Sequence, residues 1–197
     1  IITIDSNDWT SVSGTISGNV NWGNNSRIYL TGNIEIPANS TLTIEAGTVI
    51  KLNPLVNITN NGTMIINGTI EEPVVFTSTN IVHPEEHTGA WGGFIMKSAT
   101  SRLIANCAIF ADGDGATSFS FSPGGSHRSE QPVLFLQYGA AAFLTNSAII
   151  NTAGQIGNGY QSDLTFDHCH IQRAITCGEY VGGTIIVNHT AIIEFPA

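Results

Sequence analysis

The amino-acid sequence predicts an all-β protein folded as a single-stranded parallel β-helix, with about 20–22 residues in each coil. Three observations support this fold class. No segment keeps apolar residues at helical spacing over three turns, short β-branched runs recur between Gly, Asn and Asp, and these runs align at a constant period. A β-sandwich would also give short strands, but it gives no reason for a constant period. A coil of this length cannot bury its apolar face alone, so stacked coils must share one core.

The period is clearest in four C-terminal segments that align without gaps. Each ends on an isoleucine, and these are Ile109, Ile149, Ile171 and Ile192. The steps are 40, 22 and 21 residues, so the first contains one period plus a polar excursion. Since side chains alternate along a strand, we expect these isoleucines to form one inward ladder. Nearer the N-terminus, Leu42 aligns with Met64 and Val49 aligns with Ile70.

The coils are expected to fill most of the chain. We assign residues 1–28 to an N-terminal cap or first strands and residues 29–197 to the coils. The sequence stops just after a strand with no polar cap, so we expect the natural chain to continue beyond it.

Two long excursions interrupt the coils, at 77–90 and 111–131. The strands that follow them begin near Phe94 and Leu134, which occupy equivalent places in the repeat. Both excursions should therefore leave the solenoid at the same corner, in neighbouring coils. Long surface connections are where binding and catalytic residues gather, so this corner is the first candidate site.

The stretch 29–51 resembles the opening coils of secreted bacterial right-handed parallel β-helix proteins, the pectate-lyase-like superfamily. Residues 62–69, 73–78 and 91–93 continue the resemblance, which covers roughly residues 10–110. It implies a right-handed coil and a secreted or cell-surface location. The superfamily includes polysaccharide lyases, hydrolases, adhesins and passive stalk domains, so the fold alone does not select a function.

The charge balance narrows the class of partner. Six Lys and Arg face fifteen Asp and Glu, a net charge of -9, which argues against binding nucleic acid or an anionic membrane surface. The chain also has no apolar run long enough to insert into a membrane. A polyuronate would be repelled, whereas a neutral or calcium-bridged polymer would not. We expect a polysaccharide or surface glycan as partner, together with other domains of a longer chain.

The excursions carry much of the ionisable chemistry of the chain. The candidate catalytic residues are Glu85, Glu86, His127, Arg128 and Glu130. A carboxylate pair can serve glycoside hydrolysis as acid and base, whereas a lyase neutralises a uronate and removes a proton with a base. Asp112 and Asp114 are candidate metal ligands for calcium, the one cofactor expected, although Asp-Gly-Asp-Gly is also a turn sequence.

Three aromatic residues near the same corner are candidates for substrate binding. Trp91, Tyr138 and Tyr160 would offer flat apolar faces on which a sugar ring can stack.

A second candidate surface is a predicted outward column made of Asn106, Asn146, His168 and His189. Stacked Asn residues form hydrogen-bonded ladders, so a structural role is the first interpretation. The two histidines, with His170 nearby, offer ligands for a transition metal, but the pattern fixes no third ligand. Cys107 and Cys169 lie two coils apart, too far for a disulfide, so we expect buried thiols.

Two functions follow from these observations. The first is a secreted, carbohydrate-associated module that binds or processes an extended polysaccharide at the excursion corner. If it is an enzyme, it is a polysaccharide lyase or a glycoside hydrolase. The alternative is a non-catalytic surface adhesin or a structural spacer domain of a larger extracellular protein. The sequence leaves the question of catalysis open.

Overall fold

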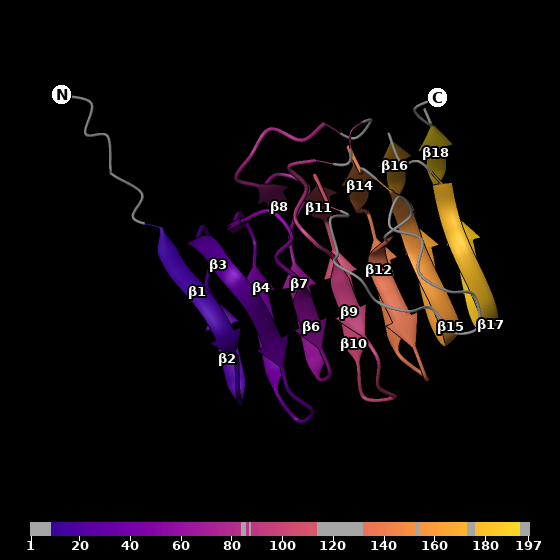
Figure 1. Ribbon diagram of the computed structural model, residues 1–197, viewed down its shortest axis with the longest axis horizontal. Coiled ribbons are helices and arrows are strands. Elements are labelled where there is room, and N and C mark those ends of the chain that lie inside the picture. Colours follow the sequence, from indigo (N-terminus) through magenta and orange to yellow (C-terminus); the bar gives the residue numbers. More distant parts are fainter. Residues whose placement is uncertain are drawn as a thin grey trace.

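The chain forms a parallel β-solenoid of about seven turns, with almost no helix (Figure 1). A computed structural model describes residues 9–83, 86, 88–113, 132–152, 154–172 and 176–193. The described strands pair in parallel, and each strand pairs with its equivalent in the next coil. The predicted all-β, β-helical fold class is confirmed.

Each coil has three faces, which we call A, B and C. Face A contains the first part of β1 (Thr10–Thr15) and of β3 (Arg27–Ile36), then β5 (Val49–Leu52), β8 (Val74–Ser78), β11 (Ala108–Ala111), β14 (Ala148–Ile150), β16 (His170–Gln172) and β18 (Ala191–Ile193). Face B contains the remainder of β1 and β3, then β6 (Ile58–Asn60), β9 (Phe94–Met96), β12 (Pro132–Gln137) and the first parts of β15 (Gln155–Asp167) and β17 (Thr176–Asn188).

Face C completes each coil. Its strands are β2 (Asn19–Trp22), β4 (Thr41–Glu45), β7 (Thr63–Asn67), β10 (Arg102–Asn106), β13 (Ala141–Thr145) and the second parts of β15 and β17. Strands β1 and β2 already pair with β3 and β4, so the solenoid begins within the segment that we assigned to a cap or first strands.

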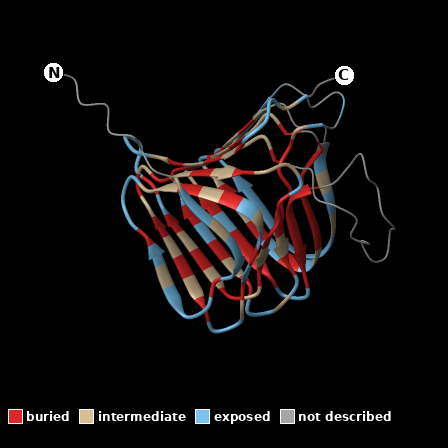
Figure 2. Cartoon of the chain, turned by 60° about the vertical axis from the view of Figure 1, so that its left-hand side comes forward, coloured by how far each residue is buried: buried red, intermediate tan, exposed pale blue. Residues whose placement is uncertain are grey.

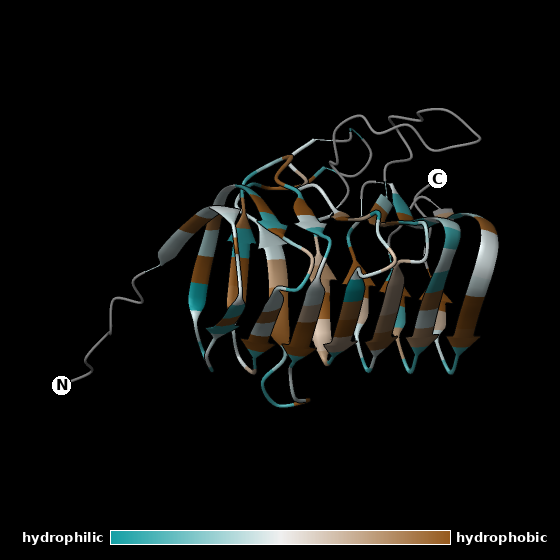
Figure 3. Cartoon of the chain, turned by 90° about the horizontal axis from the view of Figure 1, so that it is seen from below, coloured by the Kyte–Doolittle hydropathy of each residue, from teal (hydrophilic) through white to brown (hydrophobic). Residues whose placement is uncertain are grey.

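Strict alternation explains why these runs form strands around one core. In β4, Leu42 and Ile44 are fully buried while Thr41, Thr43 and Glu45 are partly exposed. The same alternation gives the striped strands of Figure 2 and the alternating hydropathy of Figure 3. Leu42 pairs with Met64, as predicted from their spacing.

The predicted register was wrong by one residue at its longest step. Phe110, not Ile109, pairs with Ile149, and Leu103 pairs with Ala142, not Phe143. A slip of one residue turns every side chain to the opposite face, so Ile109 lies on the outside. Beyond this step the prediction holds, because Ile149 pairs with Ile171 and Ile171 with Ile192.

A second alignment was also wrong. Val49 pairs with Val75, whereas Ile70 is exposed in the turn between β7 and β8. The constant-period assumption failed because this turn, 68–73, is longer than the equivalent turn between β4 and β5. Side-chain volume also helps to set which residues point inward. Three aromatic rings fill the central core and pack edge-on or tilted against one another, those of Phe76, Phe94 and Phe110.

The two excursions leave the same corner, as predicted. One joins β8 to β9 and the other joins β11 to β12, and β8 pairs with β11 while β9 pairs with β12. Both therefore run from face A to face B in adjacent coils. None of the described segments is a helix long and apolar enough to span a membrane.

Candidate functional site

In the last four coils, one residue with left-handed backbone recurs at the corner between faces C and A. Cys107, Asn146, His168 and His189 occupy it, with φ angles of 49°, 50°, 52° and 46°. The amide of Asn146 donates to the carbonyl of Asp167 at 3.0 Å, and that of His168 donates to the carbonyl of Asn188 at 3.1 Å. Asn, Asp and His adopt left-handed backbone more readily than most residues, so this geometry favours Asn and His here.

This corner largely confirms the predicted outward column. Asn146, His168 and His189 do share one position, but Cys107 rather than Asn106 is the fourth member. Asn106 lies one residue earlier, at the end of β10, where it pairs with Thr145. Its side chain still joins the column, because Asn146 Nδ2 donates to Asn106 Oδ1 at 3.0 Å. The Asn ladder is therefore real between these two coils.

Beside this column runs a second one, formed by the last residues of the face C strands. Thr145 pairs with Asp167, and Asp167 pairs with Asn188. Asp167 is thus placed next to both histidines, and sequence reasoning missed it. The signal was present, because Asp167 precedes His168 directly and lies one coil before Asn188 and His189.

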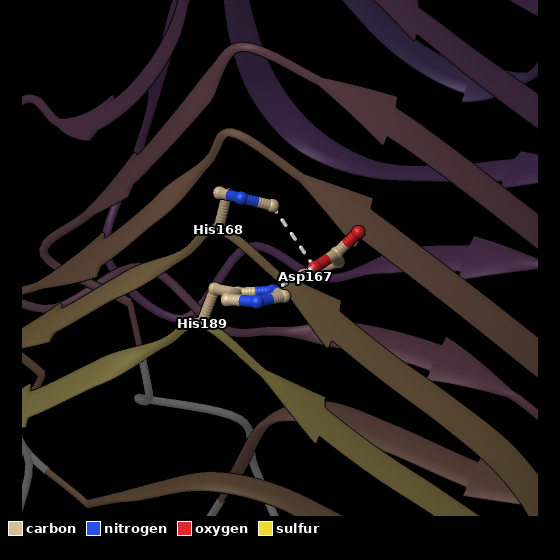
Figure 4. A group of neighbouring side chains, drawn as sticks. All are labelled: Asp167, His168 and His189. Atoms are coloured by element: carbon tan, nitrogen blue, oxygen red, sulfur yellow. Dashed lines mark hydrogen bonds and ion pairs between the residues drawn. The ribbon is translucent and has the colours of Figure 1, made fainter.

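Asp167, His168 and His189 converge on one point (Figure 4). Asp167 Oδ1 lies 3.0 Å from His168 Nδ1 and 3.4 Å from His189 Nδ1. The two imidazole rings stack with centroids 4.5 Å apart and planes inclined by 20°. The side chains are 37%, 57% and 71% exposed respectively, so solvent reaches the cluster and screens its ionic interactions.

A groove of ≈ 480 Å³ lies along the same corner. It crosses five successive coils, and its outward-facing lining includes Ile70, Ile109, Ala148, Ala191, Asn146, His168, His170 and His189. Four of these residues are register partners on face A, namely Ile109, Ala148, His170 and Ala191. The groove is hollow there because the two alanine side chains are small. Stacked coils about 4.8 Å apart give this groove a length of roughly 19 Å.

Of the predicted catalytic residues, only Glu86 lies in the part of the chain that the structure describes. Glu86 is exposed, and its amide donates to the carbonyl of His83 at 3.1 Å. Glu85, His127, Arg128, Glu130 and the predicted metal ligand Asp114 lie outside the described residues. Their roles stay predictions.

Trp91 was wrongly predicted as an exposed sugar platform. It is fully buried, its Nε1–H donates to the carbonyl of Ala111 at 2.7 Å, and it meets Phe94 edge-on with centroids 5.7 Å apart. The physical reason is that a tryptophan at the entry to face B fills the core between two coils and finds a backbone acceptor there.

Tyr138 and Tyr160 lie together at the corner between faces B and C. Their rings meet edge to face with centroids 5.9 Å apart, and the amide of Tyr138 donates to the carbonyl of Tyr160 at 3.0 Å. Tyr138 is exposed and Tyr160 is half-buried. This pair is at a different corner from the groove, and its predicted role in substrate binding stays a prediction.

Asp112 uses both carboxylate oxygens within the solenoid. Thr77 Oγ1 donates to Oδ2 at 2.6 Å, and Asn151 Nδ2 donates to Oδ1 at 2.5 Å. These donors come from the coils before and after Asp112, so one carboxylate joins three coils. The arrangement gives Asp112 a structural role, and its predicted role as a calcium ligand stays a prediction.

A comparison with known protein families agrees with this β-helical architecture. The profile of the family described as pectate-lyase like beta helix domain matches residues 14–194. The chain belongs to this family. No curated protein and no solved structure matches it. Family membership fixes the solenoid and leaves the ligand to be argued from the residues of this domain.

The cysteines of this pectate-lyase-like domain are free thiols. Cys107 and Cys169 are buried and Cys177 is exposed, as expected for the first two. Burial raises the pKa of the Cys169 thiol above its ordinary value, with a smaller contribution in the same direction from the charge of Asp167. Cys169 is therefore a packing residue of the groove wall rather than a reactive nucleophile.

Proposed function

We propose that this β-helix domain binds an extended polysaccharide in the groove along the corner between faces C and A. The observation that carries the proposal is the groove itself, which crosses five coils and is open to solvent. Its length of roughly 19 Å suits several consecutive units of a linear polymer lying along the solenoid axis. The proposal keeps the predicted partner class and moves the binding surface from the excursion corner to this one.

The lining of the groove has the chemistry that a sugar chain requires. Ile70, Ile109 and Ala148 offer apolar contact to the C–H faces of sugar rings. Asn146, His168 and His189 stand beside them with donors and acceptors for hydroxyl groups. The net charge of -9 favours a neutral glycan over a polyuronate.

We place the domain outside the cell or on its surface, in keeping with this ligand. Charged residues make up only 11% of the chain, fewer than in a typical cytosolic protein, which supports the assignment. The exposed Glu86 lies at the excursion corner and is the described candidate for any hydrolytic or lyase chemistry. Whether the bound polymer is also cleaved is decided by the same experiment that tests binding.

The test is a glycan-array and polysaccharide-binding screen, followed by titration of the best ligand. Ala148→Trp fills the groove from an outward position. Ile104→Trp places the same side chain at an exposed position of face C, outside the groove, and is the control. We expect Ala148→Trp to weaken binding at least about 10-fold, a loss of about 1.4 kcal/mol, and Ile104→Trp to leave it unchanged. Product release is measured in the same samples.

Two outcomes would overturn the proposal. Equal binding by wild type and Ala148→Trp would remove the ligand from the groove and return it to the excursion corner. Absence of binding to every glycan by a protein shown to be folded would favour the spacer or adhesin function.

A further inference from the structure

We infer that Asp167, His168 and His189 form a binding site for one divalent transition-metal ion of the zinc class. The site lies beside the groove, and it does not depend on the proposed glycan binding. Its three ligand atoms are one oxygen and two nitrogens that all lie within 4.8 Å of one another.

The distances between the ligand atoms fit such an ion. Zinc binds imidazole nitrogen and carboxylate oxygen at about 2.0–2.2 Å, which places two ligands of a tetrahedral ion about 3.3 Å apart. Asp167 Oδ1 lies 3.0 Å from one Nδ1 and 3.4 Å from the other. An ion can therefore reach all three atoms once the two imidazole rings rotate so that both nitrogens face it.

The backbone already holds the ligands in place. His168 and His189 occupy the same left-handed corner in adjacent coils, and the amide of His168 donates to the carbonyl of Asn188 at 3.1 Å. Asp167 is fixed at the end of β15 by its pairing with Asn188. Ligands supplied by a rigid element lose little freedom when an ion binds.

The cluster is poorly explained as a stabilising ion pair. Side chains exposed by 37%, 57% and 71% form ion pairs that solvent screens, so these pairs contribute little to stability. In contrast, both imidazoles direct Nδ1 toward the same carboxylate oxygen (Figure 4). An ion that replaces the Nδ1 protons would bind in the plane of each ring, once the two rings turn out of their stack.

The donor set selects the class of ion. Two imidazoles favour zinc, copper, iron or nickel over calcium, which prefers six to eight oxygens. Three protein ligands leave a fourth position for water or for an oxygen of another molecule. His168 and His189 both line the groove, so that fourth position would be reached from the solvent that fills it.

The experiment titrates EDTA-treated, dialysed protein with Zn²⁺ against a chromogenic chelator, and follows Co²⁺ by absorption. We expect one ion per chain and no thiolate-to-metal band. The variants are His168→Asn, His189→Asn and Asp167→Asn. Each is compatible with the fold, because Asn146 occupies the histidine corner and Asn188 occupies the position equivalent to Asp167. Each should weaken the affinity at least about 10-fold.

The controls separate this site from other donors on the chain. His170→Asn changes a histidine of the same groove whose Nε2 lies 3.2 Å from Gln172 Oε1, and it should leave the affinity unchanged. Cys177→Ser removes the exposed thiol and should also have no effect. Wild-type affinity in the three ligand variants, loss in either control, or no binding by folded wild type would overturn the inference.

Discussion

Several buried polar groups in this domain find their hydrogen-bond partners in a neighbouring coil, so these side chains stabilise the stack of coils. Trp91 shows this most directly, because its indole fills the core while its N–H reaches the carbonyl of Ala111. The amide of Cys169 likewise donates to Thr190 Oγ1 at 3.2 Å, one coil further on. A substitution at such a position changes packing and hydrogen bonding together. We therefore expect it to change the free energy of unfolding rather than ligand binding.

Trp91→Phe should lower the free energy of unfolding by about 1–3 kcal/mol. The variant leaves the Ala111 carbonyl without its donor and removes part of a fully buried ring. Urea denaturation measures this loss, and the glycan titration should give wild-type affinity. Tyr138→Phe, at an exposed position, is the control and should leave stability within about 0.5 kcal/mol. A Trp91 variant with native stability and weakened glycan binding would restore the sugar-platform interpretation.

At the level of strands and turns, side-chain ladders reinforce the backbone pairing of successive coils. Asp112 joins Thr77 to Asn151, and Asn146 donates to Asn106. These bonds lie at the corners, where the strands end and regular pairing is interrupted. A corner residue with oxygen acceptors can therefore fix the position of its coil relative to the neighbouring coils, as Asp112 does for three coils.

Asp112→Ala should destabilise the protein by about 2–4 kcal/mol. It removes two hydrogen bonds to a carboxylate and places alanine at a φ of 65°, a backbone conformation that alanine adopts at a cost of about 1 kcal/mol. Asp112→Asn keeps an acceptor and tolerates this backbone, so its loss should be about half as large or less. Unfolding curves with calcium and with EDTA distinguish the ladder from a calcium site. A stability that depends on calcium in wild type and not in Asp112→Asn would contradict a purely structural role.

The same elements show why the sequence predicted the solenoid better than its register or its site. Alternation and period are local properties, so the strands around Leu42 and Met64 were aligned correctly. The step across the second excursion is longer than one period, so the period does not fix its length. Matching isoleucines there gave 40 residues where the pairing requires 39. In the structure, buried Leu103 pairs with buried Ala142, and Phe143 lies on the outside. This choice depends on how side chains pack in the core, which residue spacing does not reveal.

The sequence predicted only part of the cluster of Asp167, His168 and His189, for a related reason. The 21-residue step brought His168 and His189 into one column, but Asp167 belongs to the adjacent column and is recognised only when the corner is built. The burial of Trp91 was equally hard to predict from the sequence, because tertiary packing decides which side chains are exposed where an excursion joins a coil.

On the scale of the whole molecule, one inward ladder on face A runs through the domain. Ile28, Ile50, Phe76, Phe110, Ile149, Ile171 and Ile192 are successive register partners along it. Each coil contacts chiefly its two neighbours, so the stability of a solenoid is approximately a sum of coil and interface contributions. The apolar contribution of a ladder residue then depends on whether coils cover it on both sides.

Alanine substitutions along this ladder should therefore have graded effects. Ile149 is 1% exposed between β11 and β16, whereas Ile192 is 36% exposed in β18. Ile149→Ala creates a cavity within the stack and should cost about 2–5 kcal/mol, while Ile192→Ala should cost about 1 kcal/mol or less. Urea denaturation gives both values, and hydrogen exchange should show stronger protection of β14 than of β18. Equal losses and uniform protection would mean that β18 is covered in solution, either by another copy of the chain or by residues beyond those described.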